Sequence, residues 1–209
     1  MATKEFRGQP IKDLKGYMTE QQVKKLIDSA TRPDFKMFLR LLWVTGARVS
    51  EILGDKSWYK ERIYNPAKVN DVLFDEGIII LNLLKRKQYP PPQHRVALDK
   101  ITLQNLKDYI LTEKLKPNDP LFKFSRGTAF YLLRKLGNQI GIIKVGAKKL
   151  HNHHFRHSHC VAYIRKNNTM EGLRKLQEQI GHASISTTAG YLQFGEEAQK
   201  EAEDVFGKW

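Results

Sequence analysis

Strand-type patterning in this 209-residue chain is confined to one stretch near its middle. Residues 69–74 and 78–84 are rich in branched apolar residues, a turn at Asp75-Glu76-Gly77 separates them, and residues 95–98 predict a returning strand. Pro90-Pro91-Pro92 cannot join a central ladder, so it marks a hairpin tip or a disordered loop. Apolar residues elsewhere recur at helical spacing. The pattern predicts a mainly α domain with a small antiparallel β-sheet, an α+β fold.

Local start and stop signals place the first helices. Thr19 and Gln22 form a capping box, which predicts that a helix begins there. A second helix is expected to start near Asp34 and to end at Gly46, and Arg48 begins a short third helix. Residues 54–68 are interpreted as a surface excursion. Later helices are predicted at roughly 100–113, 126–138, 154–166, 170–180, 185–192 and 195–206.

The charge balance favours a polyanionic partner. Lys and Arg number 36 against 22 Asp and Glu, a formal net charge of +14, so nucleic acid ranks first and an anionic membrane second. A single cysteine, Cys160, excludes an internal disulfide framework and fits a reducing compartment. No apolar run is long enough to span a bilayer, and the first residues lack a signal-peptide core. We therefore expect an intracellular protein.

Three motifs carry residues suited to phosphodiester chemistry. They are Thr45-Gly46-Ala47-Arg48-Val49-Ser50-Glu51, His153-His154-Phe155-Arg156-His157 and the segment from Gly181-His182 to Tyr191. Arginine offers a planar fork that binds two phosphate oxygens and keeps its charge. Histidine transfers protons near neutral pH, and a tyrosyl phosphate ester retains much of the energy of the bond it replaces.

The order of these motifs resembles that of the tyrosine recombinases, the phage-integrase family, from about Tyr17 to the end of the chain. The resemblance implies that Arg48 and Arg156 clamp the scissile phosphate and that His153 and His182 assist by hydrogen bonding or proton transfer. It further implies that Tyr191, nine residues after His182, forms a 3′-phosphotyrosine and releases a 5′ hydroxyl. His157 matches the histidine that often buttresses the site.

A lysine on the sheet hairpin serves as general acid in this family, which makes Lys85 the first candidate here and Lys87 the alternative. Alternation along a strand puts these two on one face and Arg86, a candidate for DNA contact, on the other. The run that contains Lys144, Lys148 and Lys149 is a candidate for contact with the DNA backbone. No metal or nucleotide cofactor is expected, because the transient ester stores the bond energy.

Three other interpretations of these motifs are less consistent with the sequence. Five histidines between residues 151 and 159 suggest a zinc site, but the run contains no carboxylate and Arg156 would place a positive charge beside the metal. A DNA-binding module without catalysis has no need of His182 and Tyr191 at their spacing. A type IB topoisomerase shares the chemistry, yet the surroundings of Arg48 and His182 favour a recombinase.

The extent of the family resemblance predicts the domain organisation. Residues 1–16 are interpreted as an arm or linker and residues 17–209 as the catalytic domain, either as a fragment or as a minimal enzyme. The tail helix expected at about 195–206 packs on a neighbouring subunit or on its own core. The resemblance implies double-stranded DNA as the partner, a tetramer of protomers on two DNA duplexes during recombination, and a cytoplasmic or nucleoid-associated location.

Overall fold

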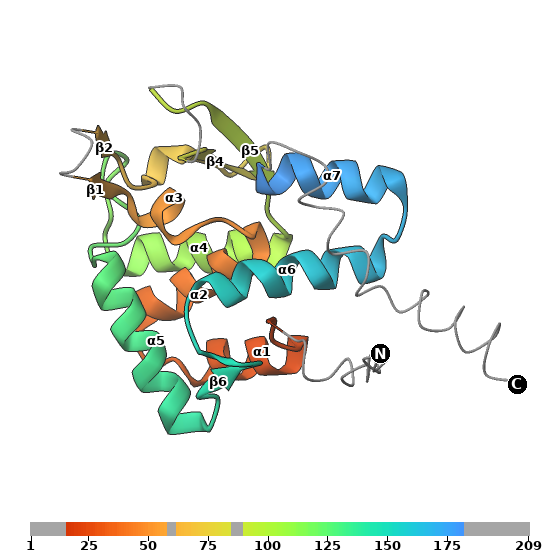
Figure 1. Ribbon diagram of the computed structural model, residues 1–209. Coiled ribbons are helices and arrows are strands. Elements are labelled where there is room, and N and C mark those ends of the chain that lie inside the picture. Colours follow the sequence, from red (N-terminus) through yellow and green to blue (C-terminus); the bar gives the residue numbers. More distant parts are fainter. Residues whose placement is uncertain (1–15, 58–61, 85–89, 182–209) are drawn as a thin grey trace, which may run out of the picture.

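A computed structural model describes residues 16–57, 62–84 and 90–181 of the chain. Helices dominate, and three small antiparallel sheets lie between them (Figure 1). The elements in chain order are α1 (Glu20–Ser29), α2 (Pro33–Thr45), α3 (Val49–Leu53), β1 (Asp55–Ser57), β2 (Arg62–Tyr64), the 3₁₀ turn η2 (Val69–Asp71), β3 (Val72–Leu73), β4 (Ile78–Asn82), β5 (Gln93–Ala97), α4 (Lys100–Thr112), α5 (Arg126–Ile140), β6 (Lys144–Val145), β7 (Lys148–Lys149), α6 (His153–Lys166) and α7 (Met170–Ile180).

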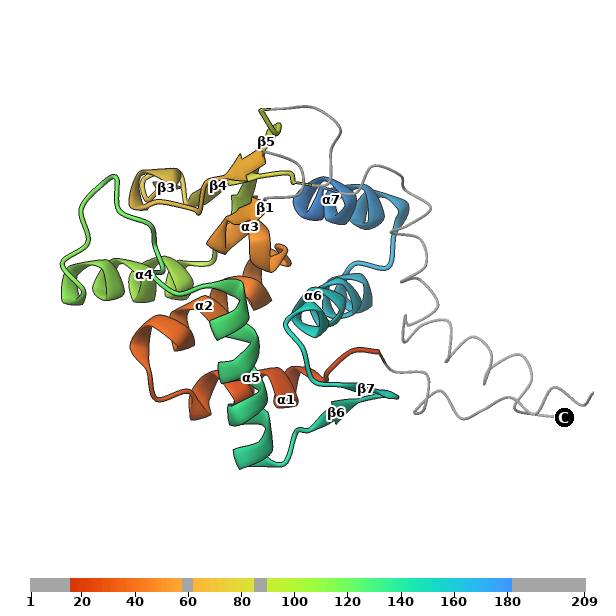
Figure 2. The ribbon, with the colours of Figure 1, turned by 60° about the vertical axis from the view of Figure 1, so that its left-hand side comes forward.

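Helix α2 forms the centre of the core. Its buried side chains face three directions, so it packs against α1, α4 and α6 together (Figures 1 and 2). Phe38 is completely buried and meets Phe122 and Phe124 edge-on, at ring-centroid distances of 5.6 and 5.3 Å. A smaller apolar cluster joins α6 to α7 through Cys160, Ile164, Leu173, Leu176 and Ile180.

The middle sheet has the order β3-β4-β5, and all its strands are antiparallel. Its last strand lies beside α7 (Figure 1). The sequence predicts a strand over 69–74, whereas residues 69–71 form a 3₁₀ turn and only Val72 and Leu73 pair with β4. The Asp71 carboxylate accepts a hydrogen bond from the Lys68 backbone N–H at 2.7 Å, which stabilises the turn in place of a ladder.

Most predicted helix boundaries are confirmed to within one or two residues. Thr19 and Gln22 form the expected capping box, and Gly46 ends α2 in the left-handed conformation. Within the predicted excursion of residues 54–68, β1 and β2 pair as a short hairpin. The β6–β7 hairpin was not predicted from the sequence. The helices expected at 185–192 and 195–206 lie outside the described residues.

In the described ranges, every helix is too short or too polar to cross a membrane.

Candidate active site

The turn that presents Arg48 depends on Gly46. This glycine ends α2 at φ 62°, a conformation that side chains with a Cβ rarely adopt. A Cβ at Gly46 would also lie 2.6 Å from Cδ2 of His159, which packs beneath the turn. His159 Nδ1 is 2.7 Å from the carbonyl oxygen of Trp43, so α6 is tied to the last turn of α2. The chain then turns into α3 with Arg48 at its N-cap.

Glu51 fixes Arg48 through two hydrogen bonds. The Arg48 backbone N–H donates to Glu51 Oε2 and the Arg48 Nη1 group donates to Oε1, both at 2.7 Å. The Glu51 side chain is completely buried, while 15% of the Arg48 side chain remains exposed. Glu51 therefore holds the arginine from inside the protein. The Arg48 Nε atom is buried without a hydrogen-bond partner in the described structure, and part of the side chain remains accessible.

Arg156 projects from α6 into the same region but is almost completely buried, with 2% of its side chain exposed. Its Nη1 group donates to the carbonyl oxygen of Gly46 at 2.8 Å, and its Nη2 group donates to that of Ile180 at 2.7 Å. Nη1 also lies 4.0 Å from Glu51 Oε2. Arg156 thus joins the C-terminal ends of α2 and α7 and shares the Glu51 carboxylate with Arg48.

Histidines surround the first turn of α6. His153 is exposed and meets His157 edge-on with ring centroids 4.6 Å apart. Partial desolvation, with a smaller contribution from His157, lowers the pKa of His153, and desolvation likewise lowers the pKa of His157. Both imidazoles are therefore neutral at pH 7, so each ring offers one N–H donor and one acceptor nitrogen.

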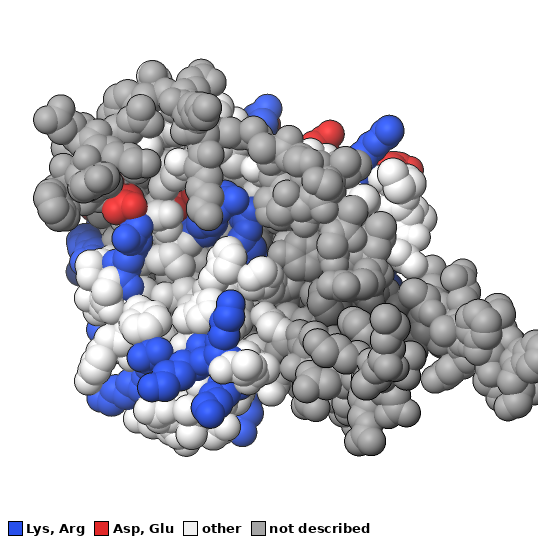
Figure 3. Space-filling view, in the orientation of Figure 1, with Lys and Arg blue, Asp and Glu red and all other residues white. Residues whose placement is uncertain are grey.

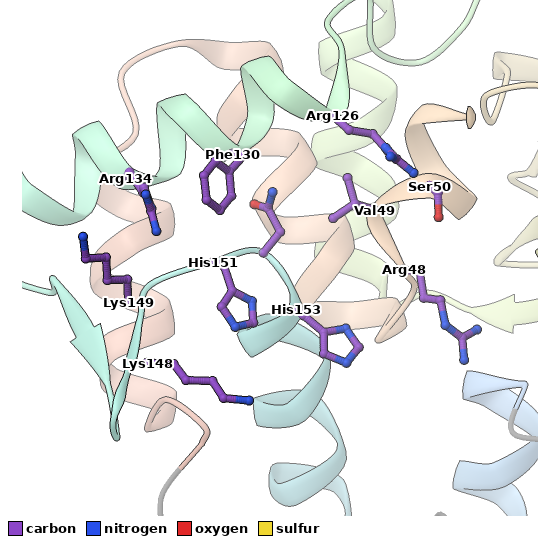
Figure 4. Close-up of a pocket in the computed structure, with 11 residues that line it drawn as sticks. Arg48, Val49, Ser50, Arg126, Phe130, Arg134, Lys148, Lys149, His151 and His153 are labelled. Atoms are coloured by element: carbon purple, nitrogen blue, oxygen red, sulfur yellow. The ribbon is translucent and has the colours of Figure 1, made fainter. Parts of the chain in front are cut away.

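An open cleft of about 680 Å³ begins at Arg48 and His153 and runs along α5 (Figure 4). Arg126, Phe130 and Arg134 of α5 point into it from one side, and Lys148 and Lys149 of the β6–β7 hairpin point into it from another. The Arg134 guanidinium lies 4.4 Å from the centroid of the Phe130 ring. The remaining lining residues are Val49, Ser50, His151 and Asn152.

Positive charge gathers on this face of the molecule. Figure 3 shows Lys and Arg side chains clustered over the region that α5 and the β6–β7 hairpin occupy in Figure 1. Among the cleft arginines, Arg126 is compensated by an ion pair with Asp55 at 2.5 Å. A cleft with this charge and an aromatic wall suits a polyanion that carries planar bases.

The predicted residues divide into three groups. The first group lines the common cleft and consists of Arg48, His153, Lys148 and Lys149. The second group does not line it: Arg156 and His157 lie on the adjoining turns of α6, and Lys144 belongs to this group as well. Lys144 is exposed on β6, where it pairs with Lys149, and does not line the cleft. The third group, Lys85, Arg86, Lys87, His182 and Tyr191, lies outside the described residues.

The sequence interpretation missed several residues of this site. Glu51 was visible in the first motif, three residues after Arg48 on a helix, a spacing that brings side chains together. Arg126 and Arg134 could have been found from the eight-residue interval that places them on one face of α5. The burial of His159 under Gly46 has no local signal, because the two residues are far apart in the sequence.

The described histidines between residues 151 and 159 are not arranged as a metal site. Within the described part of the chain, no three His, Cys, Asp or Glu side chains are grouped so that they could hold a metal ion. The Nδ1 atom of His154 instead accepts a hydrogen bond from the His151 backbone N–H at 3.2 Å, and the two rings stack with centroids 3.7 Å apart.

The chain is similar to known recombinases over most of its length. Residues 16–197 match the model of the phage integrase family. Tyrosine recombinase XerA of Pyrococcus furiosus is 29% identical over 199 residues, which cover 91% of this chain and 62% of that protein. A tyrosine recombinase of Pseudothermotoga lettingae is 26% identical and aligns with 84% of this chain and 55% of its own length.

Solved structures show the same fold. A crystal structure of XerA recombinase superposes with a TM-score of 0.67 at 25% identity and covers 90% of this chain and 64% of that one. The catalytic domain of bacteriophage HP1 integrase superposes with a TM-score of 0.61 at 17% identity, over 91% of this chain and 94% of that domain. The fold is therefore that of tyrosine recombinase catalytic domains. The chain belongs to the phage integrase family, and it spans about 62% of the length of its Pyrococcus furiosus relative.

Proposed function

We propose that this chain carries the catalytic domain of a site-specific DNA recombinase, which cuts and rejoins DNA through a 3′-phosphotyrosyl intermediate on Tyr191. The catalytic domain is assigned to residues 17–209 and residues 1–16 to an arm or linker. The observation that carries the proposal is the shared carboxylate of Glu51, which draws Arg48 and Arg156 together at the end of a basic cleft.

The contact between Leu83 and Gly181 supports the same assignment. A Cβ at Gly181 would overlap the side chain of Leu83, so the end of α7 packs directly on the chain that leaves β4. Leu83 precedes Lys85 by two residues in the sequence, and Gly181 precedes His182 by one. Leu83 and Gly181 are therefore in contact, and the segments that contain Lys85 and His182 follow them closely in the sequence.

The proposed reaction keeps its bonds and protons in balance. The Tyr191 oxygen forms a bond to phosphorus and loses its proton, while the bond between phosphorus and the 5′ oxygen breaks and that oxygen takes up a proton. Arg48 and Arg156 stabilise the charge that builds on the non-bridging oxygens. His153, His182 and Lys85 are the proposed hydrogen-bonding and proton-transfer groups, with Lys87 as the alternative lysine and His157 in support. The reverse step rejoins the strand without a cofactor.

Double-stranded DNA is the proposed partner. Lys148 and Lys149 would contact its backbone within the cleft, and Lys144 and Arg86 would do so nearby. A tetramer of protomers on two duplexes is the proposed assembly for recombination, since two duplexes supply four strands to be cut. An intracellular location, in a prokaryotic host or in one of its viruses or mobile elements, stays a prediction.

Covalent capture tests the proposal. The protein is incubated with supercoiled plasmid and with a library of nicked oligonucleotides, and the mixture is then denatured in detergent. We expect a DNA-linked band whose peptide mass maps to Tyr191. The Tyr191→Phe variant is expected to bind DNA with unchanged salt dependence and to form no adduct.

Three outcomes would count against the proposal. An adduct in Tyr191→Phe would assign the nucleophile to another residue. Salt-sensitive binding by the wild-type protein without any adduct would favour a binding module. A chelator is expected to leave the adduct yield unchanged, and a loss of adduct would return attention to metal binding by the histidine run.

A further inference from the structure

The last turn of α2 leaves backbone carbonyl groups that need donors from elsewhere in the protein. The four carbonyls at the end of an α-helix have no partner within the helix. At the end of α2, the Gly46 backbone N–H donates to the carbonyl oxygen of Leu42 at 3.1 Å. The next two carbonyls belong to Trp43 and Val44. The groups that bind them also hold the start of the turn that presents Arg48.

Side chains of α6 and α7 bind these two carbonyls. The ring of His159, on α6, has its Nδ1 atom 2.7 Å from the carbonyl oxygen of Trp43. The Nε2 group of Gln179, on α7, donates to the carbonyl oxygen of Val44 at 3.4 Å and lies 3.3 Å from Nε2 of His159. His159 is 8% exposed and meets the Trp43 ring edge-on, with centroids 6.3 Å apart. Both α6 and α7 are therefore bonded to the end of α2, through two side chains that also contact each other.

The two carbonyls decide which nitrogen of the His159 ring carries the proton. A carbonyl oxygen only accepts, so His159 Nδ1 carries the hydrogen that the Trp43 carbonyl receives. For the same reason the Gln179 amide turns its NH2 group toward Val44, and that group also faces Nε2 of the imidazole. Burial lowers the pKa of His159 to about 4, so the ring is neutral at pH 7 and Nε2 is an acceptor. A chain of hydrogen bonds thus runs from Gln179 through the imidazole to α2.

Arg156 joins the same two helix ends. It donates to the carbonyl oxygens of Gly46 and Ile180, at 2.8 and 2.7 Å. Gln179 is the neighbour of Ile180 in the sequence. The ring of His159 lies against Gly46, where a Cβ would be 2.6 Å from Cδ2 of the ring. The hydrogen-bond chain and the buried arginine therefore connect the end of α2 to the end of α7 side by side.

The separation of these helix ends determines how the two arginines are placed. Arg48 lies three residues after the end of α2, and the Arg156 guanidinium is bonded to both ends. A shift of about 1 Å in such a group can lower a catalytic rate by about a hundredfold. We propose that His159 and Gln179 are positioning residues, whose hydrogen-bond chain holds the ends of α2 and α7 at the separation that lets both arginines bind one phosphate. This inference rests on the proposed function, since it takes the scissile DNA phosphate as the ligand.

Substitutions at His159 separate its hydrogen bonds from its packing. His159→Phe keeps a ring beneath Gly46 and removes both nitrogens. We expect the rate of covalent adduct formation to fall by about tenfold to a hundredfold, while the affinity for DNA stays unchanged because it depends on many phosphate contacts. In His159→Asn the side-chain amide nitrogen can replace Nδ1 as the donor to Trp43, so this variant should recover part of the rate. Rates are compared at a temperature at which circular dichroism shows every variant to be fully folded.

Tyr109→Phe is the matched control for lost stability. The Tyr109 hydroxyl donates to the carbonyl oxygen of Leu121 at 2.8 Å, and Tyr109 is as buried as His159. The substitution therefore removes a buried hydrogen bond to a carbonyl in a part of the core that does not line the cleft. Its midpoint of thermal unfolding should fall, and its adduct rate below that midpoint should equal the wild-type rate.

A spectroscopic measurement tests the hydrogen-bond chain without DNA. Long-range nitrogen–proton NMR spectra of the full chain show which nitrogen of each imidazole carries a proton, and the signals of His159 are assigned by their loss in His159→Phe. At pH 7 we expect the His159 proton on Nδ1. Gln179→Glu places an acceptor opposite Nε2, so the ring should shift toward the form that is protonated on both nitrogens.

Equal adduct rates in His159→Phe and Tyr109→Phe, or a His159 proton on Nε2, would overturn the inference. If His159→Phe does not fold, Gln179→Glu takes its place, because it should lower the adduct rate by breaking the same chain from α7, and His159→Asn then assigns the ring signals. A wild-type protein that forms no adduct on any DNA would contradict the proposed function instead, while the position of the His159 proton would still test the hydrogen-bond chain.

Discussion

Leu83 packs against Gly181, and this contact joins the sheet hairpin to the end of α7. Gly181 ends the helix at φ 65°, and its backbone is held from the other side, because the Arg156 Nη2 group donates to the neighbouring carbonyl of Ile180 at 2.7 Å. One short stretch of backbone therefore contacts both the buried arginine and the strand that leads to the candidate lysine. A substitution at Gly181 should therefore affect the candidate site through Ile180 and Leu83 rather than through Arg48.

Gly181→Ala is expected to reduce both stability and adduct formation. The alanine Cβ would overlap Leu83, and the backbone would keep a left-handed conformation that alanine disfavours by roughly 1–2 kcal/mol. Relief of the overlap should add a cost of about 1–3 kcal/mol. Urea unfolding and covalent capture on the same preparations measure the two effects.

Gly141→Ala is the matched control for this prediction. Gly141 also ends a helix in the left-handed conformation, at φ 80°, but a Cβ there would meet nothing within 4 Å apart from its own chain neighbours and helix. Gly141→Ala should lose only the roughly 1–2 kcal/mol that the left-handed conformation costs an alanine, and its adduct yield should stay at the wild-type level. Equal behaviour of the two variants would show that the Leu83 contact has no role in the site.

Local patterns predicted the elements of this fold better than the contacts of its site. The capping box at Thr19 and the helix end at Gly46 depend on residues within one or two turns, so the sequence contains the whole signal. The β6–β7 hairpin has only two residues in each strand and no alternating apolar pattern, and for this reason it was missed.

The partners of the site residues depend on tertiary packing. Arg156 was found from its motif, but its bond to Gly46 spans 110 residues, and no sequence window contains both groups. The family pattern therefore supplied the candidate side chains, while the structure adds the contacts that Glu51 and Gly46 make with Arg48 and Arg156.

Glu51→Gln should be strongly destabilising. The change removes the negative charge that two arginines share, and Arg156 is 2% exposed and cannot regain hydration. Breaking a buried ion pair typically costs about 3–5 kcal/mol. Adduct formation should fall as well, because Arg48 loses the group that orients it. Chemical unfolding and covalent capture check both effects.

Glu76→Gln provides the control for Glu51→Gln. Glu76 pairs with Arg95 at 2.6 Å, but 54% of the Glu76 side chain and 61% of the Arg95 side chain are exposed. An exposed pair of this kind contributes at most about 1 kcal/mol. A loss of stability in Glu51→Gln as small as that in the control would mean that the buried carboxylate does not hold the arginines.

Alanine substitutions at Lys148 and Lys149 should weaken DNA binding and lower its salt dependence. Each lysine that neutralises a phosphate releases counterions, so its removal should reduce the slope of log K against log salt by about 0.9. Lys107, exposed on α4 and absent from the cleft, is the control. Fluorescence anisotropy with a labelled duplex at several salt concentrations measures the slopes. An unchanged slope in the double variant would remove the hairpin from the DNA interface.

Acidification should begin to destabilise the protein near pH 6.5, before most carboxylates titrate. Burial lowers the pKa of His154 to about 3 and that of His159 to about 4, from an ordinary value of 6.5. Both side chains are buried, so the unfolded chain binds more protons than the folded one as the pH falls below 6.5. The free energy of unfolding should therefore decrease from pH 6.5 toward pH 4, by up to about 1.4 kcal/mol per pH unit for each histidine.

Thermal unfolding between pH 7.5 and pH 4.5 measures this slope, because the range brackets the ordinary pKa of histidine. His154→Gln keeps an amide acceptor for the His151 N–H but does not titrate, so its slope should be shallower than that of the wild type. His151→Gln is the comparison, since His151 is less buried and its pKa is lowered less than that of His154. A midpoint of unfolding that stays constant down to pH 5 would mean that these rings are already protonated in the folded protein, with partners that stabilise the charge.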